Sequence, residues 1–364
     1  MSNLIYLSDI CDFQGGTQPP KEQWSTSLKD GYVRMLQIRD FTQSEKAEPE
    51  YVRYSTNLKM CKSDDILIAR YGASLGKILT GLSGAYNVAI MKTIPKENKI
   101  TKSYLYYFLL SDSFQNMIKS FASRAAQAGF NKQDLSLIKL KCPSIEQQEE
   151  ECIILNYVYN LIDKRKQQIL LLDKLIKSRF IEMFGEPLKN NKKWKTKKLK
   201  LIAPANEFTG DIEANGKMYW LLQLDMIESN TGKVLNKNLV TLDEIGASTI
   251  KFSSDNVLYS KLRPYLNKVV LPDEPGFATS EIIPLLPNEE LNKIFLAFLL
   301  RDNGIVRFLN AHVSGSKMPR VQADIFWNLD IILPTITLQN QFADFVKQTD
   351  KSKFVIQKSL NYLL

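Results

Sequence analysis

The sequence predicts a mixed α/β protein built from two repeats, with a long helix after each repeat. Three observations support this fold class. Segments of the first half recur in the same order in the second half, short β-rich runs alternate with turn residues, and residues 146–184 contain neither glycine nor proline. With 364 residues, of which 44% are hydrophobic, the chain can form two or three ordinary globular domains.

The repeat is clearest in two segments, "DILIARYGASLGKI" at 65–78 and "NVLYSKLRPYLNKV" at 256–269. The second copy keeps two leucines and the final lysine but loses both glycines, so we expect a tight turn in the first copy only. Four further pairs keep the same order: Leu7 with Leu199, "MLQI" at 35–38 with "LLQL" at 221–224, "LYYFLLSD" at 105–112 with "FLAFLLRD" at 295–302, and "CPSIEQQ" at 142–148 with "LPTITLQ" at 333–339.

Each half combines both kinds of secondary structure. Runs such as "YVRMLQIRDF" and "DILIARY" have the β-branched and aromatic composition of strands, and they are bounded by Gly, Asn and Asp. Helical patterns follow near 102–120 in the first half and near 291–310 in the second. Each half is therefore expected to be a mixed α/β globule.

A single long helix is predicted over 146–184, because Gly185 and Pro187 supply the stop signals. Its apolar residues recur at alternating steps of three and four, as in a heptad seam, and residues 339–364 show a compatible spacing. If the halves are related by a pseudo-twofold axis, the second helix runs back along the first as an antiparallel coiled coil. The alternative is that each helix packs separately on its own globule.

The expected domains are therefore 1–145 and 188–338, with helices at 146–187 and 339–364. The residues expected at the helix interface are Leu155, Val158, Ile162, Ile169, Leu172, Ile176, Phe180, Phe342, Val346, Ile356 and Leu360.

The formal net charge is +9, and it is unevenly distributed. Residues 1–145 carry 19 basic and 13 acidic side chains, whereas 199–338 carry 13 and 16. A basic excess favours a polyanionic partner, but only modestly. The densest cluster, at 189–200, is either a solvated linker or a phosphate-binding segment. The apolar runs are too short to cross a membrane and the first residues lack a signal-peptide pattern, so we expect a cytoplasmic protein.

No catalytic constellation is evident. Gly72, Gly76 and Lys77 miss the P-loop spacing by one residue, and Ile78 stands where a magnesium-binding hydroxyl belongs. "TQPPK" at 17–21 lacks the aromatic residue of an amino-methyltransferase motif, and "ENK" at 97–99 lacks the partner of a nuclease motif. Four scattered cysteines and one histidine support neither a disulfide framework nor a zinc site, so no metal or cofactor is expected in this chain.

The chain resembles the specificity subunit of type I restriction-modification systems over essentially its whole length. The resemblance depends on "DILIARYGASLGKI", "LKCPSIEQQ" and "LDKLIKSRFIEMFG", and most specifically on "KSRFIEMFG" and on the proline followed by glutamine at the start of each helix. It implies two target recognition domains, each reading half of a split DNA site, with the helices as a ruler and as a platform for two methyltransferase subunits. Restriction subunits, SAM, and ATP with magnesium are then expected in the rest of the complex.

On this interpretation the repeated segment places basic and polar side chains at a DNA groove. Phosphate contacts would position each domain, and neighbouring loops at 123–134 and 312–324 would read base edges. A competing interpretation is that the segment is a core strand whose lysine points to solvent. The runners-up for function are a stand-alone DNA-binding scaffold protein and, less favoured, a self-contained nucleic-acid enzyme. The residues expected to contact DNA are Arg70, Lys77, Gln127, Asn131, Lys132, Lys261, Arg263, Lys268, Ser316, Lys317 and Arg320.

Overall fold

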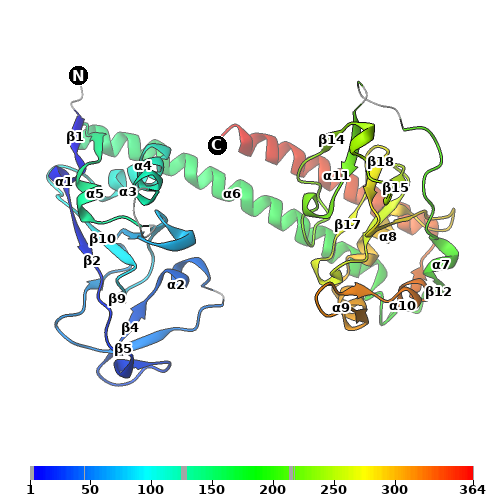
Figure 1. Cartoon of the computed structure of the whole chain (residues 1–364), viewed down its shortest axis with the longest axis horizontal. Helices are drawn as coiled ribbons and strands as arrows, with labels where there is room; N and C mark the ends of the chain where they lie inside the picture. Colours follow the sequence, from blue (N-terminus) through cyan, green and yellow to red (C-terminus); the bar gives the residue numbers. More distant parts are fainter. Residues whose placement is uncertain (1–3, 45, 124–128, 213–215, 217, 364) are drawn as a thin grey trace. The chain divides into compact units, whose positions relative to one another are not determined.

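A computed structural model describes residues 4–44, 46–123, 129–212, 216 and 218–363 (Figure 1). Gln127 lies outside the described residues. The chain divides into two compact units, Met1–Leu161 and Ile162–Leu364. Both units combine helices with β-sheets, so the predicted mixed α/β fold class is confirmed.

The first unit contains a five-stranded sheet, a four-stranded sheet and a short antiparallel pair. The five-stranded sheet has the order β3 (Trp24–Ser25), β5 (Glu50–Arg53), β4 (Tyr32–Leu36), β9 (Gly84–Tyr86), β6 (Met60–Cys61). The four-stranded sheet has the order β2 (Cys11–Gly15), β10 (Ile90–Pro95), β7 (Leu67–Ala69), β8 (Ile78–Leu79), and the pair is β1 (Leu4–Tyr6) with β11 (Lys139–Lys141). Its shorter helices are α1 (Leu7–Ile10), α2 (Ile38–Thr42), α3 (Lys102–Leu110), α4 (Asp112–Ala122) and α5 (Lys132–Ser136).

The second unit repeats this plan with smaller sheets. A four-stranded sheet has the order β14 (Asn238–Val240), β13 (Tyr219–Leu222), β18 (Gly276–Thr279), β15 (Thr249–Phe252). A three-stranded sheet has the order β17 (Val269–Val270), β16 (Val257–Ser260), β19 (Ile282–Leu285), and the pairs are β12 (Lys195–Lys198) with β22 (Asp330–Leu333) and β20 (Val313–Ser314) with β21 (Arg320–Val321). Its shorter helices are α7 (Leu199–Ile202), α8 (Lys293–Leu300), α9 (Asn303–Ala311) and α10 (Ala323–Trp327).

The sequence repeat corresponds to a structural repeat. In the first unit β4 pairs in parallel with β9, and in the second unit β13 pairs in parallel with β18, although every other strand pair is antiparallel among the residues described. The amide of Leu7 donates to the carbonyl of Ile138 at 2.8 Å, and the amide of Leu199 donates to that of Leu329 at 2.9 Å. The paired motifs thus occupy equivalent places in the two units.

The long helices are present. Helix α6 spans Ile145–Phe184 and α11 spans Ile336–Asn361. Gly185, with φ +77°, follows α6 in the left-handed conformation that glycine favours at a helix end. Within the part of the chain that the structure describes, no helix is long and apolar enough to cross a membrane.

Within the second unit, α11 packs antiparallel on the C-terminal part of α6. Lys353 donates to Asp173 at 2.8 Å, and the rings of Phe342 and Phe180 lie 5.3 Å apart, so the two helices run in opposite directions. The alternative in which each helix packs separately is therefore wrong. Of the residues expected at this interface, Ile162, Ile176, Phe180, Phe342, Val346 and Leu360 are buried, and Ile169, Leu172 and Ile356 are half-buried. Leu155 and Val158, in the first unit, are also half-buried.

A buried glutamine fixes the start of each long helix. The Gln148 side chain accepts a hydrogen bond from the Thr101 amide at 2.8 Å, and its Nε2 donates to the carbonyls of Lys99 and Pro143, each at 3.0 Å. Gln339 makes the equivalent three bonds in the second unit. Both glutamines are fully buried. Because a buried amide needs partners for its donor and acceptor, this arrangement holds each helix to its own globule at one register.

The basic cluster at 189–200 is structured. Lys195–Lys198 form β12, and Lys197 and Lys198 pair with Glu290 and Asp330. The Lys192 Nζ donates to the carbonyls at the C-terminus of α6. A cation at this end of a helix is favourable, because the last carbonyls lack intrahelical partners. Residues 195–198 are thus a strand of the fold rather than a linker, although the cluster's lysines are mostly exposed to solvent.

Candidate nucleic-acid interface

The repeated segment forms the same hairpin in both units. In the first unit β7 leads through the 3₁₀ helix η2 (Gly72–Ser74) into β8, and in the second β16 leads through η5 (Pro264–Leu266) into β17. Gly72 and Gly76 have φ of +71° and +78°, and the equivalent Arg263 and Asn267 both have φ of +50°. The expectation of a tight turn in the first copy only is therefore wrong.

Contacts from distant residues explain how the second hairpin keeps this conformation without glycine. Asparagine tolerates the left-handed region, but an arginine there is strained by roughly 1–3 kcal/mol. The Arg263 amide donates to the Pro319 carbonyl at 2.7 Å, and the Asn267 side chain donates to the Arg301 carbonyl at 3.1 Å. Tertiary hydrogen bonds thus hold both left-handed residues. A strand–turn–strand arrangement also differs from a P-loop, which requires a helix after the turn.

Each hairpin lies against the second segment that the sequence singled out. Tyr71 forms a bridge with Gly129, and Leu262 forms the equivalent bridge with Arg320. The amide of Val321 also donates to the carbonyl of Lys261 at 3.0 Å. The structure therefore brings together, within each unit, the two segments expected to face DNA.

In the first unit, the predicted contact residues have different surroundings. The Arg70 side chain already bonds within the protein: its Nε donates to the Phe130 carbonyl at 3.2 Å and its Nη1 to the Val88 carbonyl at 3.1 Å. Asn131 caps α5, while Lys132 is exposed. The contacts of these residues with DNA stay predictions.

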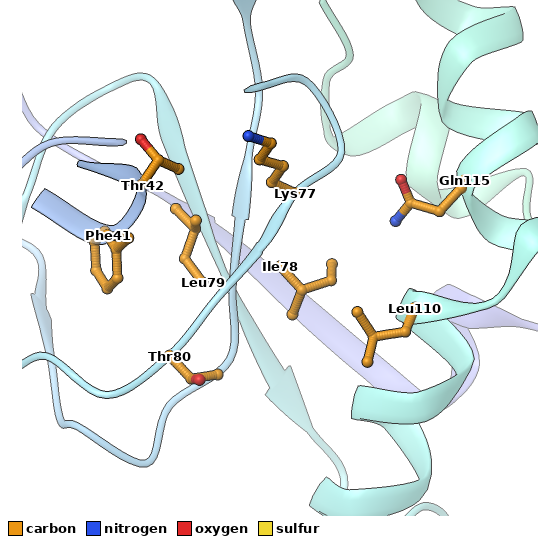
Figure 2. Close-up of a pocket in the computed structure, with 8 residues that line it drawn as sticks. All are labelled: Phe41, Thr42, Lys77, Ile78, Leu79, Thr80, Leu110 and Gln115. Carbon is orange, nitrogen blue, oxygen red and sulfur yellow. The ribbon is translucent and has the colours of Figure 1, made fainter. Parts of the chain in front are cut away.

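Lys77 is exposed beside an open pocket of about 430 Å³ in the first unit. Figure 2 shows Lys77–Thr80 between Phe41 and Thr42 of α2 on one side and the helical residues Leu110 and Gln115 on the other. The Gln115 side chain donates to the carbonyl of Gly76 at 2.9 Å and so fixes the end of the turn. Among the described residues the Lys77 side chain has no ion-pair or hydrogen-bond partner, so its position on the hairpin suits a phosphate contact.

The predicted residues of the second unit separate into exposed and engaged groups. Arg263, Ser316 and Lys317 are exposed, whereas Lys261 is half-buried. Lys268, the counterpart of Lys77, donates through Nζ to the Leu224 carbonyl. Burial lowers the pKa of Lys268, and nearby Asp225 only partly opposes this effect. Arg320 is paired with Glu281. The equivalent lysines of the two units therefore differ in accessibility.

Two residues that support the second hairpin were not predicted from the sequence. The half-buried Arg301 donates through Nε to the Val269 carbonyl at 3.1 Å, and desolvation of its guanidinium lowers its pKa to about 10. Glu281, the residue just before β19, accepts hydrogen bonds from the Arg320 side chain. Arg301 lies in the repeated "FLAFLLRD" motif, but its first-unit counterpart is Ser111, so the repeat gave no sign of a supporting cation at this position.

The helices also carry exposed apolar side chains. Leu170, Leu171 and Leu175 on α6 and Phe354 and Val355 on α11 are all exposed. Single exposed apolar residues are ordinary, whereas a contiguous exposed apolar patch is typical of a protein-binding surface. In the described residues, no group of three or more His, Cys, Asp or Glu could hold a metal ion.

The family of type I restriction modification DNA specificity domains matches this chain twice, over residues 3–171 and 191–363. The chain belongs to this family. The resemblance seen in the sequence is thereby confirmed, together with the repeated target recognition domains. The family is one of DNA recognition rather than catalysis, and the chain is a noncatalytic specificity protein.

Individual relatives agree with this assignment. The chain is 23% identical to the type I restriction enzyme MjaVIII specificity subunit of Methanocaldococcus jannaschii, over 83% of this chain and 76% of that protein. It is 24% identical to the EcoDI specificity subunit of Escherichia coli, over 38% of this chain and 31% of that protein.

Solved structures share the fold. The crystal structure of the type I restriction-modification S subunit from M. genitalium has a TM-score of 0.57 at 14% identity, covering 99% of this chain and 92% of that one. A chain from a study of complex assembly and conformational transition of a type I system has a TM-score of 0.57 at 12% identity, covering 99% and 94%. At these identities the likeness concerns the fold alone.

Proposed function

We propose that this chain reads a split DNA site, with each unit recognising one half, and that it positions methyltransferase and restriction subunits on that DNA. The observation that carries the proposal is the pair of equivalent hairpins. Both have the same backbone conformation, but the side chains on them differ, as Gly72 and Ser74 correspond to Arg263 and Tyr265. Two different half-sites require this combination of one scaffold and two sets of side chains.

The helices supply the second part of the proposal. Because each buried glutamine fixes a helix to its globule, the length of α6 would set the separation of the two readers and hence the spacer between half-sites. The exposed apolar group on α6 and α11 is suited to docking two methyltransferase subunits. SAM, and ATP with magnesium, would then act in the partner subunits, and the complex would work in the cytoplasm.

Coexpression with the adenine methyltransferase of the same system, followed by sequencing of methylated DNA, tests the proposal. The expected result is copurification of the two proteins and methylation of a split motif with a nonspecific spacer. Copurification with no sequence-specific methylation would refute the reading function. DNA binding without any methyltransferase association would favour the stand-alone scaffold, and SAM or ATP binding by the purified chain alone would favour an enzyme.

A further inference from the structure

Arg320 and Glu281 form a side-on ion pair beside the second hairpin. The Arg320 Nε lies 3.1 and 3.0 Å from the two carboxylate oxygens, and its Nη2 lies 2.7 Å from Oε1. The Arg320 side chain is 41% exposed, but that of Glu281 is only 22% exposed. The carboxylate is therefore set back, while the guanidinium reaches toward solvent.

This pairing leaves one edge of the guanidinium available. Arginine has five N–H donors in one plane, and Glu281 occupies those of Nε and one of Nη2. The outer edge, formed by Nη1 and the second N–H of Nη2, has no other partner among the described residues. That edge matches the O6 and N7 acceptors of guanine, which arginine contacts in a bidentate manner in the major groove.

Charge distinguishes a base contact from a phosphate contact at this place. A phosphate is attracted by uncompensated positive charge, but Glu281 neutralises Arg320 locally. Bidentate hydrogen bonding to a base edge survives that neutralisation, and the carboxylate reduces the rotamer freedom that binding would otherwise remove. Hydrogen bonding from Arg320 lowers the pKa of Glu281, and nearby Lys261 adds to the effect, so the carboxylate stays charged at neutral pH.

The first unit has the same backbone positions without the pair. The amide of Lys261 donates to the Glu281 carbonyl, and that of Arg70 donates to the Ala89 carbonyl, so Ala89 corresponds to Glu281. By the equivalent bridges, Gly129 corresponds to Arg320. A Cβ at Gly129 would lie 2.4 Å from the Tyr71 ring, so this place in the first unit cannot accept an arginine without rearrangement.

We propose that Arg320, positioned by Glu281, reads one guanine in the half-site recognised by the second unit. This inference rests on the proposed function and adds the chemistry of one base contact. Arg320 is the contacting residue, and Glu281 is a positioning residue that orients it. The half-site of the first unit has no equivalent contact at the corresponding position.

The test uses the complex with its methyltransferase and DNA duplexes carrying every single-base change in the mapped site. The wild-type complex should lose affinity on the order of 10- to 100-fold when one guanine of the second half-site is replaced. Arg320→Gln should remove this discrimination at that position alone, and Glu281→Gln should weaken it. Glu290→Gln, which alters the exposed pair with Lys197, is the matched control and should change nothing.

Two further readouts keep the inference falsifiable. Replacing that guanine by 7-deazaguanine removes the N7 acceptor and should weaken wild-type binding, but not binding of the Arg320→Gln complex. Retained discrimination in the first half-site shows that the variant is folded and that the proposed function stands. Uniform weakening at all sequences with a shallower salt slope would assign Arg320 to a phosphate and overturn the inference, as would unchanged discrimination. If the wild-type complex bound all the duplexes with equal affinity, the proposed function itself would be refuted.

Discussion

Replacing Gln339 with methionine should destabilise the second unit strongly although the volume of the side chain changes little. The glutamine Oε1 accepts from the Asn292 amide at 2.9 Å, and Nε2 donates to the carbonyls of Glu290 and Pro334 at 3.0 and 2.9 Å. Methionine keeps the length of the chain but leaves these three backbone groups without that partner. Each buried group left unsatisfied costs about 1–3 kcal/mol, so a loss of about 2–4 kcal/mol is expected after partial rehydration.

Urea unfolding followed by tryptophan fluorescence measures this loss, since three of the four tryptophans, Trp194, Trp220 and Trp327, lie in the second unit. With a slope of about 2–3 kcal/mol per molar urea, the midpoint should fall by roughly 1 M. Gln348→Met, at an exposed position of the same helix, is the matched control and should change stability by less than about 0.5 kcal/mol. Equal midpoints for the two variants would refute the role assigned to the buried glutamine.

Three other outcomes are expected. Lys77→Ala should make the slope of log K for DNA binding against log salt concentration shallower by about one. Lys268→Ala should lower stability and leave that slope unchanged, because its ammonium group already bonds to the Leu224 carbonyl. Binding titrations across salt would contradict this difference if both variants gave the same slope. Inserting seven residues after Lys166 and seven after Lys353 keeps the heptads in phase, and should lengthen the nonspecific spacer by ~10 Å with unchanged half-sites. Mapping an unaltered spacer in methylated DNA would rule out the helices as a ruler. A double-mutant cycle between Asp173 and Lys353 should give a coupling of about 0.5–1 kcal/mol, and additive effects would argue against their pairing in solution.

The helices and the repeat could be predicted because their signals are local and periodic. A seam of apolar residues at steps of three and four reports which face of a helix is covered, and Gly185 marks where α6 ends. The pairing of α11 with α6 could also be predicted, because the second helix of the repeat carries a compatible apolar stripe that needs to be covered.

The hairpins could be located but not fully described from sequence. Losing two glycines suggested a lost turn, yet Arg263 and Asn267 keep positive φ because residues 34 or more positions away hold them. Lys268 resembles Lys77 in the alignment, but only the position of the Leu224 carbonyl shows that its ammonium group is engaged. Local sequence patterns predict the path of the backbone. Whether a side chain is free to contact DNA depends on tertiary contacts that those patterns do not contain.

In the proposed function each unit reads its own half of a split DNA site. Exchanging residues 1–145 for the corresponding module of another family member, and mapping methylated DNA in a host that carries the complete system, tests it most directly. The first half-site should change to that of the donor, while the second half-site and the spacer stay the same, because residues 188–338 and both helices are untouched. A change in both halves, or in neither, would contradict the claim.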